Sequence, residues 1–248
     1  MSDELTWQPY RDALQRLSDI GRGAQFWLRD DDATQPTAPL NQLLALTRHH
    51  EVPLSLAVIP ALTGEDLAAS LQAEDHVSVT VHGWSHENHA PAERKKQELG
   101  SDRPAGTVLA ELEAGFDRLQ TLYPETFEPV LVPPWNRIDA TLLPALPALG
   151  YRAVSVYGKA KPNSPIQPVN THVDIMDWHG TGGCRPQAEL VALLVAELTD
   201  RLAGSGEPIG ILTHHLVHDA PAWAFLERLF EESRMPAVSW RPLGALIG

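Results

Sequence analysis

Ionisable side chains stand at the ends of several apolar runs in this sequence. The run 26–28 leads into Arg29 and three aspartates at 30–32, the run 77–81 into two histidines, and later runs into Asp174, Asp177 and His214. If these runs are parallel strands, their carboxyl ends meet at one edge, so we expect the ionisable groups to converge. Carboxylates and imidazoles gathered in one place can bind a divalent metal and transfer protons.

His82 and His86 are spaced so that both can reach one cation. Their separation puts two imidazoles on one side of a helical turn or of an extended strand end. A carboxylate from Asp31 or Asp32 is the natural third ligand, because such a site leaves positions open for water. His89 is a competing ligand, but it falls in a polar segment without a strand to support it.

Adjacent carboxylates beside a dication can take different roles. One can bind the metal while its neighbour stays ionised and takes a proton from the attacking water. The alternative is a solvated acidic turn or a helix cap, which explains less well why the aspartates follow an apolar run.

A second proton-transfer pair is predicted from the later strands. Asp177, with Asp174 as the alternative, can fix the tautomer of His214 so that this imidazole protonates a leaving group. The alternative is a buried structural histidine. His215 is expected to point to the opposite face if the strand continues.

Tryptophans accompany these motifs. In Val132-Pro133-Pro134-Trp135 the prolines stiffen the turn, so the Trp135 N–H is a candidate donor to a developing oxyanion. The indoles of Trp84, Trp135 and Trp178 can pack on the C–H face of a sugar, or they can simply fill the core.

Strands and helices alternate along the chain. Apolar runs predict strands, amphipathic segments predict helices, and the alternation favours a parallel sheet covered by helices, a (β/α) barrel of seven or eight strands in a single domain spanning 1–248. The expected strands are 25–29, 53–59, 77–81, 129–132, 152–156, 172–176, 209–213 and a weaker one at 237–240. The expected helices are 8–20, 37–50, 64–73, 107–122, 139–148, 187–203 and 220–233. Segments 87–104 and 158–170 are expected to be loops at the rim of the site.

Composition narrows the function classes. The net charge of -13 disfavours nucleic acid and anionic membranes as partners, and 43% hydrophobic residues suffice for a large core. The single Cys184 excludes an internal disulfide. With no apolar stretch of membrane-spanning length and no basic leader, we expect a cytoplasmic protein with no protein partner implied.

The motifs together resemble the NodB-homology polysaccharide deacetylases, carbohydrate esterase family 4, in order across residues 28–214. The resemblance implies a distorted (β/α) barrel with Asp31 as base and Asp32, His82 and His86 as metal ligands, although Asp30-Asp31 is an alternative register for the aspartate pair. The family's Asp-x-x-Asp-Trp matches Asp174-Ile175-Met176-Asp177-Trp178, and its Leu-x-His matches Leu212-Thr213-His214. By this resemblance His214 is the acid, oriented by Asp177, and we expect Trp84, Trp178 and Pro134 to contact substrate.

The resemblance breaks at one motif. The family's Arg-Pro-Pro-aromatic is Val132-Pro133-Pro134-Trp135 here, so the arginine that holds the base is absent from that position. Arg29, Arg137 or Arg185 can replace it from elsewhere, or the base stands unsupported. Ala33 also replaces the usual glycine after the aspartates.

The sequence thus predicts metal-dependent removal of acetyl from an N-acetylated sugar or glycan. The expected metal is Zn²⁺, with Co²⁺, Ni²⁺, Fe²⁺ or Mn²⁺ as alternatives. Hydrolysis of a non-sugar amide, for example a cyclic one, is the second reading. A catalytically silent carbohydrate-binding protein, suggested by Val132, is the third.

Overall fold

The apolar runs of the sequence form one parallel sheet. The computed structural model describes residues 3–248, in which neighbouring strands follow the order β6-β5-β4-β3-β2-β1-β8-β7, with β9 beside β1. The strands are β1 (Ala24–Ala33), β2 (Leu54–Val58), β3 (Val77–His82), β4 (Phe127–Val132), β5 (Ala153–Val154), β6 (Gln167–Pro168), β7 (Val173–Asp174), β8 (Ile209–Thr213) and β9 (Val238–Trp240). Each of these pairings is parallel.

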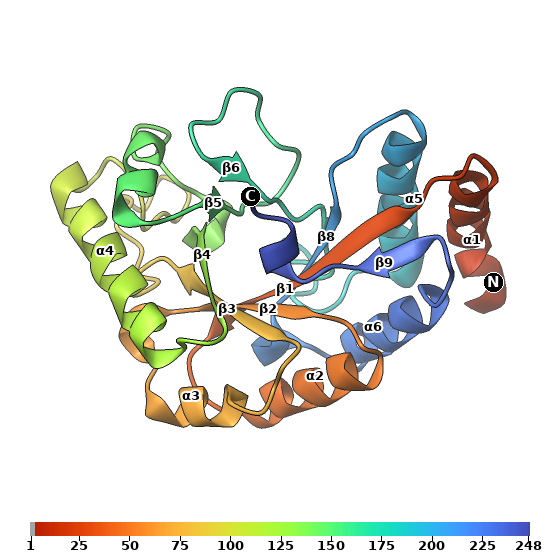
Figure 1. The fold of residues 1–248 in the computed structure, drawn as a ribbon, viewed down its shortest axis with the longest axis horizontal. Coiled ribbons are helices and arrows are strands. Elements are labelled where there is room, and N and C mark those ends of the chain that lie inside the picture. The colour runs from red at the N-terminus through yellow and green to blue at the C-terminus, as the bar shows by residue number, and fades with distance from the viewer. Residues whose placement is uncertain (1–2) are drawn as a thin grey trace.

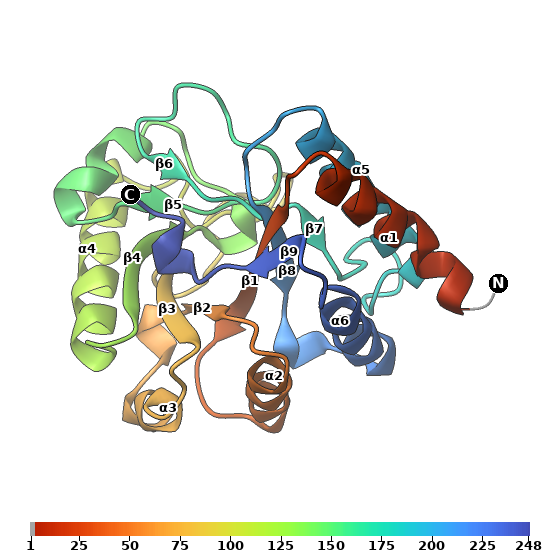
Figure 2. The same cartoon turned by 45° about the vertical axis from the view of Figure 1, so that its right-hand side comes forward.

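The sheet curls into a distorted barrel, as Figures 1 and 2 show from two directions. Its irregular side is the segment that carries β6 and β7, which changes neighbours midway. Thr171 N donates to Val156 O beyond the end of β5 at 3.0 Å, and His172 N donates to Gly210 O on β8 at 2.7 Å. The predicted (β/α) barrel is therefore confirmed, and the short β6 is an addition within a segment expected to be a loop.

Helices cover the outside of the sheet (Figure 1). Two of them begin at capping side chains: Thr37 accepts from Leu40 N, and Asp219 accepts from Ala222 N. Each longer helix buries a stripe of residues spaced three or four apart, such as Leu190, Leu194 and Leu198. The helices are α1 (Asp3–Asp19), α2 (Ala38–His49), α3 (Glu65–Leu71), α4 (Ala105–Leu122), α5 (Gln187–Leu202) and α6 (Ala220–Glu232).

The helix expected at 139–148 is wrong in type. The chain forms a 3₁₀ segment over Leu143–Leu149. Pro144 and Pro147 lie within it and lack the N–H groups that α-helical hydrogen bonds need.

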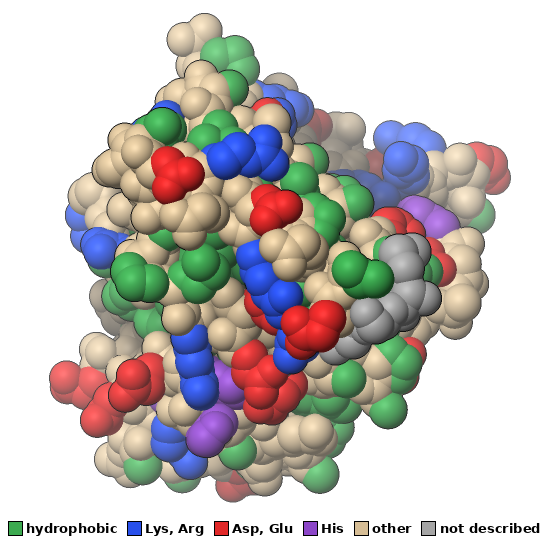
Figure 3. Space-filling model, turned by 90° about the vertical axis from the view of Figure 1, so that its right-hand side faces the viewer, with side chains coloured by type: hydrophobic (Ala, Val, Ile, Leu, Met, Phe, Trp, Pro, Cys, Tyr) green, Lys and Arg blue, Asp and Glu red, His purple; other side chains and the backbone are tan. Residues whose placement is uncertain are grey.

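The helices on one side of the barrel are joined by mixed charges. Arg11 and Arg228 each pair with both Glu4 and Glu232, so that α1 and α6 share a charged network. Figure 3 faces this side and shows acidic and basic side chains intermingled. Across residues 3–248, none of the helices combines the length and apolar character needed to cross a bilayer.

The interior of the barrel is closed at the end where the strands begin. Trp27 from β1, Val130 from β4 and Ala153 from β5 form a small apolar cluster with Leu243 and Ile247 from the C-terminal segment. Because the strands enter the barrel at this end, the C-terminal segment plugs the bottom and leaves the opposite end for the site.

This plug predicts a stability effect. Replacing Leu243, which is 2% exposed, with alanine should lower the free energy of unfolding by about 2–4 kcal/mol, because a buried cavity results. Urea denaturation measures the change. Leu62→Ala is the matched control: Leu62 is 59% exposed, so the loss should be within about 0.5 kcal/mol. Equal losses for both variants would contradict a packed plug.

Candidate metal centre and active site

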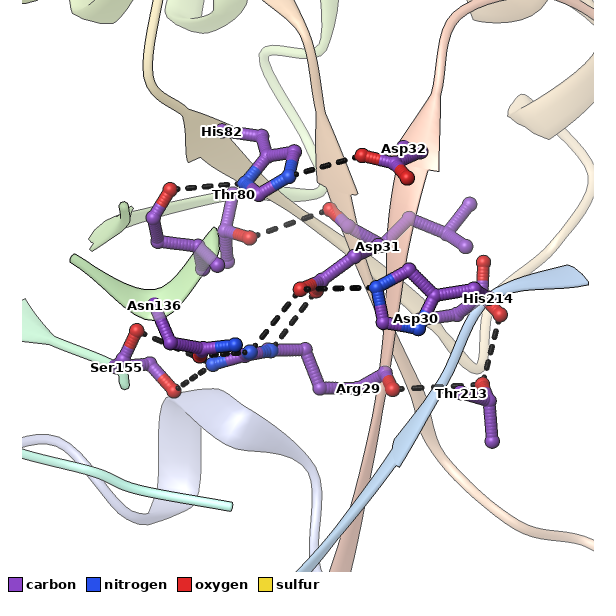
Figure 4. A network of polar contacts seen from close by, with 12 residues as sticks. Arg29, Asp30, Asp31, Asp32, Thr80, His82, Asn136, Ser155, Thr213 and His214 are labelled. Atoms are coloured by element: carbon purple, nitrogen blue, oxygen red, sulfur yellow. Dashed lines mark hydrogen bonds and ion pairs between the residues drawn. The ribbon is translucent and has the colours of Figure 1, made fainter. Parts of the chain in front are cut away.

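The three consecutive aspartates lie on the last part of β1 and diverge. Side chains alternate along a strand, so Arg29 and Asp31 share one face while Asp30 lies on the other. The pairing of β1 with β2 shifts register between Asp30 and Ala33, and Asp32 takes a left-handed backbone with φ of 71°. Because of this irregularity, the carboxylate of Asp32 points in a different direction from those of Asp30 and Asp31 (Figure 4).

Asp30 is buried in an ion pair with His215. It contacts His215 Nδ1 and accepts hydrogen bonds from His215 N at 2.8 Å and Thr213 Oγ1 at 2.7 Å. Burial would raise the pKa of Asp30, but the charge of His215 and the hydrogen bonds lower it overall. Burial would likewise lower the pKa of His215, and Asp30 raises it. These contacts fill the carboxylate's acceptor positions, which makes Asp30 a structural group.

Asp31 lies against Arg29, and both are buried. Arg29 Nε is 2.8 Å from Asp31 Oδ1, and Nη2 donates to Oδ2 at 3.0 Å. On its other side, Asp31 Oδ2 is 3.9 Å from His214 Nε2. The carboxylates that face His82, His86 and His214 are therefore those of Asp31 and Asp32, rather than the alternative pair Asp30 and Asp31.

Asp32 meets the two histidines predicted as ligands. Asp32 Oδ1 is 3.1 Å from His82 Nε2 and 3.3 Å from His86 Nε2, and one ligand atom from each residue lies within 4.8 Å of the others. Among the described residues, these three form the one such group of histidine, cysteine and acidic side chains. His89 is not part of it.

The donor set fits a divalent cation. Ligands about 2.1 Å from one metal ion are separated by about 3.0–3.4 Å, which matches the two Asp32 contacts. His82 Nδ1 bonds to Val132 O at 2.9 Å, an arrangement that leaves Nε2 free as a ligand. Burial would raise the pKa of Asp32, but His82 and the neighbouring histidines lower it, so the carboxylate is ionised and ready to bind.

The loop that joins His82 to His86 is shaped by a buried acid. Glu98 accepts hydrogen bonds from the backbone N–H groups of Trp84 and Ser85. Gly83 has a φ of 60°, and a side chain there would collide with Glu98 and Pro134. His86 is also left-handed, with φ of 59°. The imidazoles thus converge through this irregular loop rather than through a helical turn.

A second irregular turn follows β4. Trp135 and Asn136 both have left-handed backbones, with φ of 55° and 57°. The Trp135 ring packs 4.4 Å from the ring of His86, and Asn136 Oδ1 accepts from Arg29 Nη2 at 2.7 Å. Pro134 is buried behind this turn, against Gly83, rather than open to a substrate.

His214 stands at the end of β8, and of the two carboxylates considered as its partner, Asp174, the alternative to Asp177, is the one on which it acts electrostatically. Asp174 Oδ2 accepts a hydrogen bond from Trp178 Nε1 at 2.8 Å, and the Trp178 ring meets the His214 ring edge-on, with the ring centroids 4.7 Å apart. Burial raises the pKa of Asp174, and the charge of His214 opposes that shift. Asp177 instead accepts from Thr181 N at 3.0 Å and closes its own turn. The register of the turn after β7 decides this outcome.

Of the tryptophans expected to contact substrate, Trp178 packs against the ring of His214 and is 45% exposed. Trp84 lies elsewhere. It borders a shallow hollow of about 500 Å³ with Thr107, Ala110 and Glu111 of α4, so it packs on the outer side of its loop. That Trp84 contacts substrate stays a prediction.

One of the three candidate arginines reaches Asp31. Arg29 contacts Asp31, whereas Arg137 donates to Lys96 O and Arg185 to Asp174 O and Glu189. Arg29 also donates to Ser155 O and Oγ at 3.1 and 2.7 Å. Ser155, Asn136 and Glu98 were not identified from sequence, because a serine after a strand, an asparagine in a turn and a glutamate in a charged loop are common surface patterns.

Comparisons with known proteins identify the fold. No protein-family model matches the chain, and no curated protein matches it in sequence. Among solved structures, a protein from Mycobacterium smegmatis named as a polysaccharide deacetylase superposes with a TM-score of 0.67 at 17% identity, covering 91% of this chain and 89% of that one.

Two further structures are similar. A peptidoglycan deacetylase from Bacillus subtilis gives a TM-score of 0.56 at 13% identity, covering 91% of this chain and 90% of its own. A family 4 acetyl xylan esterase from Clostridium thermocellum, in complex with a cobalt ion, gives 0.54 at 15% identity, covering 90% and 89%. The chain therefore has the NodB-like fold of the polysaccharide deacetylases.

Proposed function

We propose that this protein is a metal-dependent deacetylase that hydrolyses the N-acetyl amide of a sugar or glycan. The observation that carries the proposal is the position of Asp31. Its carboxylate lies between His214, at 3.9 Å, and the cluster of Asp32, His82 and His86. The negative charge of Asp31 acts to raise the pKa of His82 and of His86. A base, an acid and a metal-binding cluster thus adjoin at the open end of the barrel. The similar structures named as deacetylases and esterases support the assignment.

Asp32, His82 and His86 would hold a divalent cation, which when bound supplies a Lewis acid for the amide carbonyl and acidifies a water. Two imidazoles and one carboxylate suit Zn²⁺, and Co²⁺, Ni²⁺, Fe²⁺ or Mn²⁺ are alternatives. The cobalt ion in the Clostridium thermocellum esterase supports a metal site in this fold.

The chain's own residues supply the proton transfers. Asp31, held by Arg29, accepts a proton from the water that attacks the acetyl carbon. His214 donates a proton to the amine nitrogen as the C–N bond breaks, which releases acetate and the free amine. Trp135 N–H is the proposed donor to the oxyanion, and Trp178 offers its exposed ring to the substrate.

The contact between Arg29 and Asp31 bears on the silent-protein alternative. That alternative was suggested by Val132, which left the base without an arginine. Arg29 Nε is 2.8 Å from Asp31 Oδ1, so the proposed base has an arginine beside it, and the absence of one at position 132 no longer favours a silent protein. Hydrolysis of a non-sugar amide uses the same residues, so substrate panels must separate it from sugar deacetylation.

Loss of either histidine ligand should empty the metal site. We expect His82→Ala and His86→Ala to lower the bound metal measured by elemental analysis from about one ion per chain to near none. His172→Ala is the control, because His172 is buried, as His82 is, but is not one of the clustered residues. Full metal content in both ligand variants would refute the proposed centre.

Removing the base should abolish turnover without removing the metal. Asp31→Asn is expected to lower kcat for acetate release about 10²–10⁴-fold at unchanged metal content. The assay follows acetate release from N-acetylated oligosaccharides and N-acetyl sugars, and ring opening for cyclic amides. Asp30→Asn is the register control: it should destabilise the fold by breaking the pair with His215 while turnover of the folded enzyme stays within a few-fold. Full activity in Asp31→Asn would remove Asp31 as the base.

Substitution of the two acids near β7, Asp174 and Asp177, should have different effects on kcat. Asp174→Asn should lower kcat about 10-fold or more, because Asp174 and Trp178 border His214. Asp177→Asn should leave kcat within about twofold, since Asp177 bonds only within its turn among the described residues. A larger effect from Asp177 would restore the pairing expected from sequence.

A further inference from the structure

We propose that Arg29, fixed by Asn136 and Ser155, is the positioning residue for the base Asp31, and that this clamp replaces the arginine absent at position 132. The inference rests on the proposed function and concerns how that site is built. It assigns roles to three residues that lie in separate parts of the chain.

The side chain of Arg29 is confined to the interior of the barrel. Trp27, Arg29 and Asp31 alternate along the inner face of β1, so Arg29 lies inside the barrel between the bottom plug and the site. Its side chain is fully buried. A guanidinium in such a place is stable only when its donors are used, which gives it few permitted positions.

Each nitrogen of the Arg29 guanidinium lies against a polar partner. Arg29 Nη1 donates to Ser155 O and Oγ just after β5, while Nη2 donates to both Asn136 Oδ1 and Asp31 Oδ2. Nε forms the remaining contact with Asp31 Oδ1. Figure 4 shows the guanidinium between these groups. The planar fork is held from one side by Ser155 and Asn136, and it presents two nitrogens to Asp31.

The turn that carries Asn136 has an unusual backbone. Trp135 and Asn136 are left-handed in succession, a strained arrangement that residues other than glycine rarely adopt. This turn sends the Trp135 ring to His86 and the Asn136 amide to Arg29. One turn therefore sets both the metal side and the base side of the site. Val132, which ends β4 at the family's arginine position, is buried and contributes its carbonyl to His82.

The test compares kcat, KM, zinc content and crystal structures of variants. Arg29→Met should lower kcat about 10- to 100-fold with KM and zinc content near wild type, because the base is displaced while the metal ligands keep their places. Arg29→Lys should restore part of kcat, since an ammonium gives one contact to Asp31 instead of a fork. Asn136→Ala should have a smaller effect, and Ser155→Ala the smallest because the Ser155 carbonyl still accepts from Arg29.

A double-mutant cycle separates positioning from general damage. If Asn136 acts through Arg29, then Arg29→Met/Asn136→Ala should have the same kcat as Arg29→Met alone. Arg201→Met is the matched control. Arg201 is a buried arginine paired with Glu197 at 2.9 Å on α5, so its loss should lower stability but leave kcat unchanged.

The crystal structures decide the question independently of turnover. In Arg29→Met and Asn136→Ala, the Asp31 carboxylate should leave its wild-type position while Asp32, His82 and His86 stay in place. An unmoved Asp31, or a kcat within twofold of wild type at full zinc content, overturns the proposal. If Arg29→Met does not fold, Asn136→Ala and Arg29→Lys carry the same comparison. A wild-type enzyme without amide hydrolysis counts against the proposed function, whereas the position of Asp31 still tests the clamp.

Discussion

Three adjacent carboxylates on one strand must be kept apart and separately neutralised, and the arrangement of the site follows from how this is done. Side by side and buried, they would repel one another and raise one another's pKa. Here Asp30 turns to His215 behind the sheet, Asp31 to Arg29 inside the barrel, and Asp32 to His82 and His86 above it. Strand alternation separates the first two, and the left-handed backbone at Asp32 separates the third.

Each partner comes from a different part of the barrel, so the fold itself is required to neutralise the aspartates. Asp30 and His215 join β1 to the end of β8, Arg29 joins β1 to the residues after β4 and β5, and Asp32 joins β1 to the loop after β3. A buried charge without its partner is costly. The polar layer at the open end therefore links the strands across the barrel, above the apolar plug formed by the C-terminal segment.

The sequence predicted the barrel and the groups that converge, because both depend on local patterns. Apolar runs and stripes are visible along the chain, and parallel strands bring their ends together regardless of detail. Contacts that depend on the course of a turn could not be predicted. The sequence left open whether Asp174 or Asp177 accompanies His214, since a one-residue change in a turn redirects a side chain. In the structure Asp174 bonds to Trp178, whose ring meets His214, and Trp84 lies beside α4. The 3₁₀ segment over Leu143–Leu149 arises from prolines whose effect the apolar spacing concealed.

The presence of an arginine at position 29 and of Val132 at the end of β4 has a physical explanation in the barrel. A buried carboxylate needs a cation beside it, but the strand from which that cation comes matters less than whether its guanidinium reaches the carboxylate. Position 29 reaches Asp31 from the same strand, two residues away and on the same face. Val132 is buried, so an arginine in its place would be a second buried cation and would need an acid of its own to pair with. A small apolar residue at 132 avoids that cost, and its carbonyl remains available to orient His82.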